Sequence, residues 1–137
     1  MATNVKLKLR TKELTQSIRD TASRRMYQAV EVVKVAQLET LSGDRSGRTY
    51  KVPGTNRTYT ASRPGQPPAQ ATGGLRQSLQ TSVSGKGRTI TGKSGTKLPY
   101  GKMLDDGTLK IAPRPWLMPS LLRALPKLRE IFKRSWL

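Results

Sequence analysis

The strongest hydrophobic pattern along the chain lies in its first third. Apolar residues recur there at spacings of mostly three and four, which predicts a long amphipathic helix over residues 11–42, ending before Gly43. Ahead of it, residues 4–10 alternate apolar with polar side chains, so residues 1–10 are expected to form a strand or an ordered arm. The helical stripe, expected to face the core, consists of Leu14, Ile18, Ala22, Met26, Val30, Val33 and Leu41.

Residues 43–74 have no hydrophobic period. Gly, Pro, Ser and Thr dominate, which predicts one long extended loop. Such a length is unusual in a small domain and is commonly functional. Cations interleaved with Tyr50 and Tyr59 suit phosphate backbones and stacked bases, although we favour the alternative that the loop orders against a neighbouring subunit. The candidate DNA-backbone contacts are Arg45, Arg48, Lys51, Arg57 and Arg63.

Residues 75–112 predict antiparallel strands. LRQSLQTSV (75–83) and RTIT (88–91) flank a turn at Gly85, Lys86 and Gly87, and a third extended segment is expected near residues 109–111. Residues 113–137 begin with a Pro-rich bend and continue as an amphipathic helix, with Pro119 at its first position and a kink at Pro126. The apolar stripe of this helix, expected to cover the sheet, consists of Leu121, Leu122, Leu125, Leu128, Phe132 and Trp136.

These elements predict one domain over residues 1–137. Its class is α+β: a small antiparallel sheet packed by the long N-terminal helix and the C-terminal helix, with the long Pro/Gly-rich loop between them. The hydrophobic share of 34% is low for a globular protein, which agrees with a modest core and long loops.

Composition narrows the function classes. The chain contains no Cys and no His, which removes disulfides, thiolate metal sites and the commonest general base. Of its eight acidic residues, the one close pair is Asp105 and Asp106, and neighbours on a strand point to opposite faces. We therefore expect no enzyme, and neither a cofactor nor a metal.

The net charge of +18 is spread evenly along the chain. A chain this basic is attracted to polyanions, with nucleic acid the first candidate, although a solvated basic surface or an acidic protein neighbour fits the charge equally well. No apolar run approaches the roughly 18 residues of a membrane span, and the first residues lack the apolar region of a signal peptide. The expectation is a soluble protein made in the cytoplasm, without a membrane partner.

GRTITGKS (87–94) fits the pattern of a phosphate-binding loop, G-x-x-x-x-G-K-[ST]. That loop needs a buried strand before the first Gly and a helix starting at the Lys. Here a polar segment precedes Gly87, while Gly95 and Pro99 disfavour a helix after Ser94. The context predicts part of a β-hairpin and no nucleotide site.

Four short motifs follow one another in the second half of the chain. Residues 61–69 read ASRPGQPPA, 72–78 read TGGLRQS, 100–108 read YGKMLDDGT and 114–121 read RPWLMPSL. In this order they resemble the motifs of tailed-bacteriophage neck and tail-completion (head–tail joining) proteins, a family of minor tail components. Departures from the family pattern are Trp116 for Phe, Ser120 for Ala, Gly101 for Ala, and Asp105-Asp106 for Glu-Phe.

The resemblance implies a non-enzymatic virion protein, made in the host cytoplasm, that forms a homo-oligomeric ring between the head and the tail. Its partners would be other neck, head-completion and tail proteins, and genomic DNA touched through the backbone. Arg114 and Pro115 would fix the start of the last helix, with Trp116 buried. A tail-terminator ring subunit and a free, non-sequence-specific nucleic-acid-binding protein are the alternatives. The residues to which the resemblance assigns a structural or interface role are Pro64, Gly65, Pro67, Pro68, Leu75, Tyr100, Gly107, Arg114, Pro115, Trp116, Leu117 and Pro119.

Overall fold

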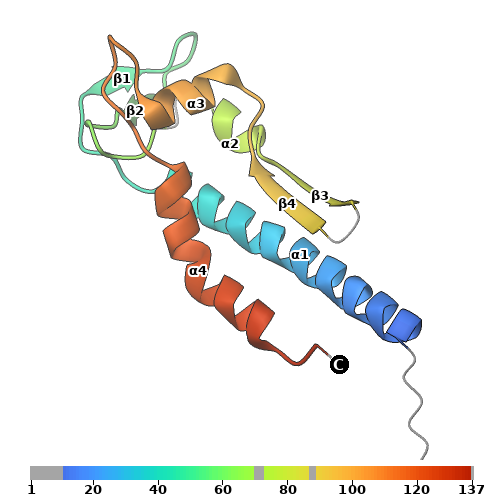
Figure 1. The fold of residues 1–137 in the computed structure, drawn as a ribbon. Coiled ribbons are helices and arrows are strands. Elements are labelled where there is room, and N and C mark those ends of the chain that lie inside the picture. Colours follow the sequence, from blue (N-terminus) through green and yellow to red (C-terminus); the bar gives the residue numbers. More distant parts are fainter. Residues whose placement is uncertain (1–10, 70–72, 87–88, 137) are drawn as a thin grey trace, which may run out of the picture.

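The computed structural model describes residues 11–69, 73–86 and 89–136, so the predicted arm over residues 1–10 lies outside the described residues. The fold is α+β, as predicted, with a long N-terminal helix, a C-terminal helix and small antiparallel sheets (Figure 1). The elements are α1 (Thr11–Ser42), β1 (Thr49–Lys51), β2 (Thr58–Thr60), α2 (Gly74–Gln77), β3 (Gln80–Lys86), β4 (Thr89–Gly95), α3 (Pro99–Asp106) and α4 (Leu117–Lys133).

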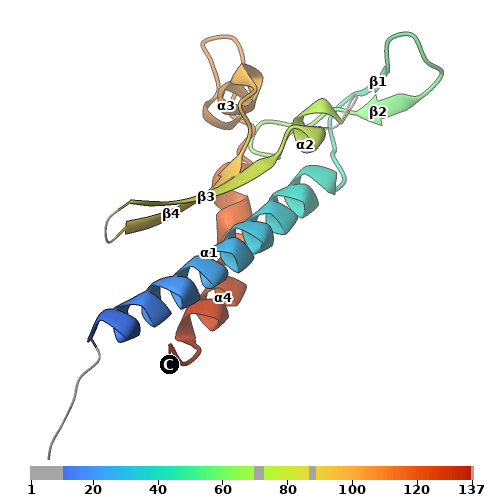
Figure 2. The same ribbon diagram turned by 90° about the vertical axis from the view of Figure 1, so that its right-hand side faces the viewer.

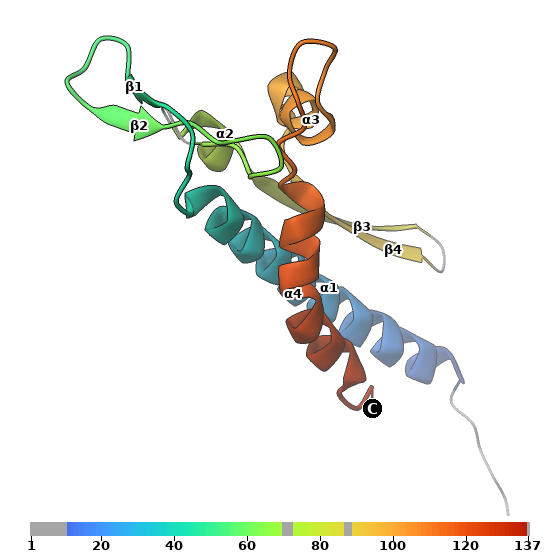
Figure 3. The ribbon, with the colours of Figure 1, turned by 90° about the vertical axis from the view of Figure 1, so that its left-hand side faces the viewer.

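Helix α1 is the centre of the molecule. It packs against α4 on one side and against both strands of the β3–β4 hairpin on another (Figures 1 and 3). The apolar stripe of α4 was predicted to cover the sheet, and this is wrong, because α4 packs on α1. Helix α4 begins at Leu117, two residues before Pro119, and runs without interruption through Pro126.

The β3–β4 hairpin lies along α1 (Figure 2). Its pairing runs from Gln80↔Gly95 to Lys86↔Thr89, so Gly85 and Lys86 belong to strand β3 and not to the predicted turn at residues 85–87, whose last residue lies outside the described residues. The predicted strand over 75–83 is also shortened, since α2 occupies residues 74–77. The hairpin is tied to α1 by Gln37, whose Nε2 donates to the Ser94 carbonyl (3.0 Å) and whose Oε1 accepts from Ser94 Oγ (2.8 Å).

Two further expectations were wrong. The segment 43–74 is not structureless, because β1 and β2 form an antiparallel hairpin inside it. No strand forms at residues 109–111; helix α3 precedes them, and its C-terminus is closed by Gly107, whose N–H donates to the Met103 carbonyl (2.8 Å). Gly107 has φ +78°, a conformation that disfavours any residue with a Cβ.

The buried core is thin. Leu41, Leu79 and Trp116 form its main cluster, with Leu38 and Leu75 packed against it. The remaining buried apolar residues are mostly small, and small side chains allow helices to approach closely. Large apolar side chains on α4 remain exposed instead, which leaves much of its predicted stripe unpaired within one chain.

Candidate nucleic-acid interface on the β1–β2 hairpin

The β1–β2 hairpin brings two aromatic rings together on an exposed surface. Tyr50 and Tyr59 are register partners, and their ring centroids lie 5.9 Å apart. Cross-strand aromatic pairs of this kind stabilise a short hairpin that has few other contacts. Because the Tyr50 side chain is 48% exposed, the pair also offers a surface on which a base can stack.

Exposed cations lie on the same hairpin and its flanks, and Lys51, which directly follows Tyr50 in β1, is on the opposite face from the rings. Arg48, Lys51, Arg57 and Arg63 are all exposed, and among the described residues no carboxylate lies within ion-pair distance of them. These cations, together with the exposed Tyr50 ring and the half-buried Tyr59 ring, can contact phosphates and stack on bases without reading sequence. The structure therefore brings four of the five predicted DNA-contact residues to one hairpin and its flank.

Arg45, the fifth predicted contact, has a different role. Its guanidinium donates to the carbonyl oxygens of Thr40 (2.8 Å), Gly43 (2.6 Å) and Pro67 (2.7 Å). Burial lowers the pKa of this guanidinium from its usual value, and the Asp44 carboxylate partly offsets that shift. Arg45 thus joins the end of α1 to the Pro-rich loop. Because its N–H donors already bind carbonyl oxygens of the chain, Arg45 is not a candidate DNA contact in the folded protein.

The Pro/Gly-rich segment is fixed by polar contacts around its Pro-Gly turn. Gly65 has φ +86° and donates its N–H to the Pro113 carbonyl (3.0 Å), while Pro68 is buried. The Gln66 amide accepts from the Arg63 backbone N–H (2.9 Å) and donates to Ser46 Oγ (2.9 Å). These contacts hold the base of the loop, so the β1–β2 hairpin projects from an ordered support.

The bend before α4, formed by Arg114, Pro115 and Trp116, contacts this loop. Arg114 Nε donates to Ser62 Oγ (2.9 Å), which links the bend to the loop. Trp116 is 1% exposed, which confirms the expectation that it is buried, and its Nε1–H donates to the Gly101 carbonyl (2.9 Å). A Cβ on Gly101 would lie 2.5 Å from Thr96 Cγ2, so glycine is required at this close approach.

Asp105 is a structural residue that sequence reasoning missed. Its Oδ1 accepts from the backbone N–H groups of Trp116 (2.9 Å), the residue that precedes α4, and of Leu117 (3.0 Å), the first residue of α4. A capping carboxylate normally immediately precedes its helix, whereas this one comes from α3, eleven residues earlier. No local signal identifies such a cap.

The other residues that match the phage neck-protein motifs lie partly in the core and partly on the surface. Leu75 packs against the core cluster, while Tyr100 and Leu117 are exposed and Pro119 is half-buried within the first turn of α4. Their exposure is compatible with contacts to another chain.

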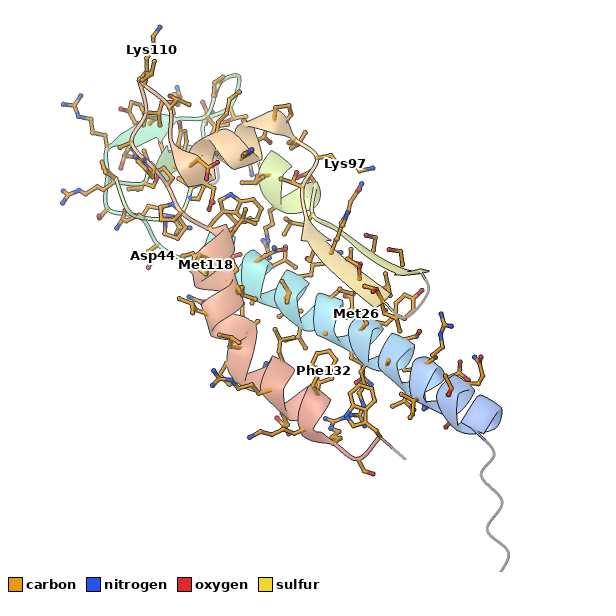
Figure 4. The ribbon with its side chains drawn as sticks, viewed as in Figure 1. Met26, Asp44, Lys97, Lys110, Met118 and Phe132 are labelled. Atoms are coloured by element: carbon orange, nitrogen blue, oxygen red, sulfur yellow. The ribbon has the colours of Figure 1, made fainter. Side chains whose placement is uncertain are left out.

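The glycine and lysine of the phosphate-loop pattern that lie in β4, Gly92 and Lys93, have roles in the strand and in its packing on α1. Residues 89–95 form strand β4 with Lys93 exposed, so no helix begins at this lysine. A Cβ on Gly92 would lie 2.5 Å from Met26 Sδ and 2.6 Å from Val30 Cγ1. Gly92 is therefore required for the close packing of β4 on α1 (Figure 4 shows Met26 at this contact).

Within the described part of the chain, no three His, Asp, Glu or Cys side chains gather as a metal site, and no helix is long and apolar enough to cross a membrane. Comparison with known proteins finds no matching family model, no matching curated sequence and no matching solved structure.

Proposed function

We propose that this protein is a structural subunit of the bacteriophage neck, a ring-forming tail-completion protein that joins the DNA-filled head to the tail. The observation that carries the proposal is an accessible surface too large for a compact monomer, with apolar side chains left uncovered on α4. The order of the ASRPGQPPA, TGGLRQS, YGKMLDDGT and RPWLMPSL motifs gives this surface its assignment to the neck.

The total accessible surface is 10513 Å². A compact monomer of this mass is expected to expose roughly 7,100 Å². Even if the residues outside the described ranges had the full surface of an unfolded chain, about 2,600 Å², the rest would still expose about 7,900 Å² against roughly 6,500 Å² for a compact protein of that size. A stable protein–protein interface buries about 800 Å² on each partner, so an extended chain with this much additional surface has room for contact with neighbouring subunits.

The exposed face of α4 is the best candidate for one of these interfaces. Met118, Leu121 and Leu122 are 60%, 40% and 59% exposed, and their spacing places them on one side of the helix. We assign a second copy of this chain to this face. A subunit of a closed heterologous ring uses two different surfaces, and the exposed face of α4 would be one of them.

The first test is electron microscopy of lysates from a phage in which this gene is inactivated. Full heads separated from complete tails support the proposal, whereas intact, infectious particles contradict it. Leu122→Glu should abolish both oligomer formation in sedimentation and complementation of the inactivated gene, because it places a charge in the apolar interface. Thr91→Glu, on the exposed outer face of the hairpin, is the control and should retain both.

The tail-terminator layer is the close alternative, and the same micrographs separate it, because tails of abnormal length are then expected. A free nucleic-acid-binding protein is the second candidate, favoured by the exposed cations on the hairpin of Tyr50 and Tyr59 and on its flanks. For that function the isolated protein must bind DNA with a steep dependence on salt. An affinity that does not change with salt eliminates it.

A further inference from the structure

A second basic site lies at the opposite end of the molecule from the β1–β2 hairpin. The middle of α1 lies near the residues that follow α4 (Figure 1). A pocket of about 320 Å³ opens between these two segments. Thr21, Arg24, Arg25 and Gln28 line it from α1, and residues 134–136 line it from the end of α4. Three of the seven lining residues are arginines and none is acidic.

Arg25 is the fixed component of this pocket. It is 8% exposed, and its guanidinium lies 4.4 Å from the centroid of the Trp136 ring. It donates to the carbonyl oxygens of Arg134 (2.8 Å) and Ser135, at the end of α4 where the helix dipole favours a cation. These two bonds use two of the five N–H groups of a guanidinium. Arg25 is therefore a positioned cation with remaining donor capacity.

Arg24 and Arg134 add two exposed cations at the same pocket. Arg24 donates to Thr21 Oγ1 (3.3 Å), and among the described residues no carboxylate forms an ion pair with any of the three guanidinium groups. Three cations around one small pocket repel each other unless an anion is bound between them. Asp20 and Glu130 precede Arg24 and Arg134 by four residues each. In the described structure, however, neither carboxylate forms an ion pair with them, and Asp20 accepts instead from Gln16 Nε2 (2.9 Å).

We propose that this pocket binds a phosphate group. Guanidinium groups match phosphate oxygens in a bidentate geometry, and several of them together favour a multiply charged anion. The Thr21 hydroxyl and the Gln28 amide provide neutral donors beside them. The phosphate belongs either to a nucleic-acid backbone or to the free ion, and the site stands apart from ring formation and from the hairpin interface.

The test uses the full chain and the fluorescence of Trp136, whose ring lies at the pocket. Titration with inorganic phosphate at constant ionic strength should give a saturable change that chloride and acetate do not give. Arg24→Ala combined with Arg134→Ala should weaken phosphate binding by about tenfold or more, because two charge-assisted sets of hydrogen bonds are lost. Arg25 stays native, since its side chain holds the end of α4.

The matched control is Lys97→Ala combined with Lys110→Ala. These two exposed lysines point away from the α1–α4 pair (Figure 4), and their removal lowers the net charge by the same amount. The control should bind phosphate like the native chain. The Trp136→Phe variant should lose the signal, which identifies the reporter. No saturable response to phosphate, an equal response to acetate, or equal losses in both double variants would each overturn the proposal.

A second arm distinguishes the two sources of phosphate. If the phosphate belongs to a nucleic-acid backbone, a short single-stranded DNA should compete with inorganic phosphate, and the arginine double variant should bind that DNA more weakly than the lysine double variant. Phosphate binding that DNA does not displace would support the site with the free ion as its ligand and refute the nucleic-acid source.

Discussion

Replacement of Trp116 tests the part of the fold on which α4 depends. This side chain is 1% exposed, belongs to the Leu41 and Leu79 cluster, and donates its indole N–H to the Gly101 carbonyl. Trp116→Ala removes the largest buried side chain and should lower the free energy of unfolding by about 3–5 kcal/mol. A domain typically has a total stability of about 5–15 kcal/mol, so the loss is a large fraction of it.

Trp116→Phe separates the two contributions. It keeps an aromatic ring in the cluster but leaves the Gly101 carbonyl without its donor, which should cost about 1–3 kcal/mol. Urea denaturation followed by far-UV circular dichroism measures both variants without depending on tryptophan fluorescence. Lys127→Ala, at an exposed position of α4, is the control and should change stability by less than about 0.5 kcal/mol. A loss below about 1 kcal/mol for Trp116→Ala would refute the assigned role.

Substitutions at four further positions test single contacts. Gly92→Ala should destabilise the protein by about 1–3 kcal/mol because its Cβ would collide with α1, whereas Gly95→Ala, with nothing within 4 Å of the added Cβ, should be neutral in the same denaturation assay. Asp105→Ala should cost about 1 kcal/mol through loss of the cap on α4, with Asp105→Asn retaining part of it; equal stability of all three proteins in thermal melts would contradict the cap. Arg45→Ala should reduce stability and leave the salt dependence of DNA binding unchanged. Arg57→Ala should leave stability unchanged and reduce the salt slope of DNA binding by about 0.9, and the reverse pattern in titrations at several salt concentrations would overturn both assignments.

The elements that the sequence predicted well are those with a local cause. Helix α1 spans residues 11–42 as expected, because its apolar period repeats over many turns before Gly43. The β3–β4 hairpin was recognisable from its Thr- and Val-containing segments around glycines, although its register was displaced. The β1–β2 hairpin was missed, since each strand has only three residues and no period can be recognised over that length.

The sequence alone determined the two long helices, the α+β class, the absence of Cys and His, and the even positive charge. Tertiary structure alone decided which surface α4 covers, which side chains close the ends of α4, and which arginines remain exposed. Asp105 caps α4 from another helix, and Arg25 contacts its end from more than a hundred residues away. Hydrophobic period and helix propensity act over a few residues, whereas donors and acceptors pair wherever the folded chain places them.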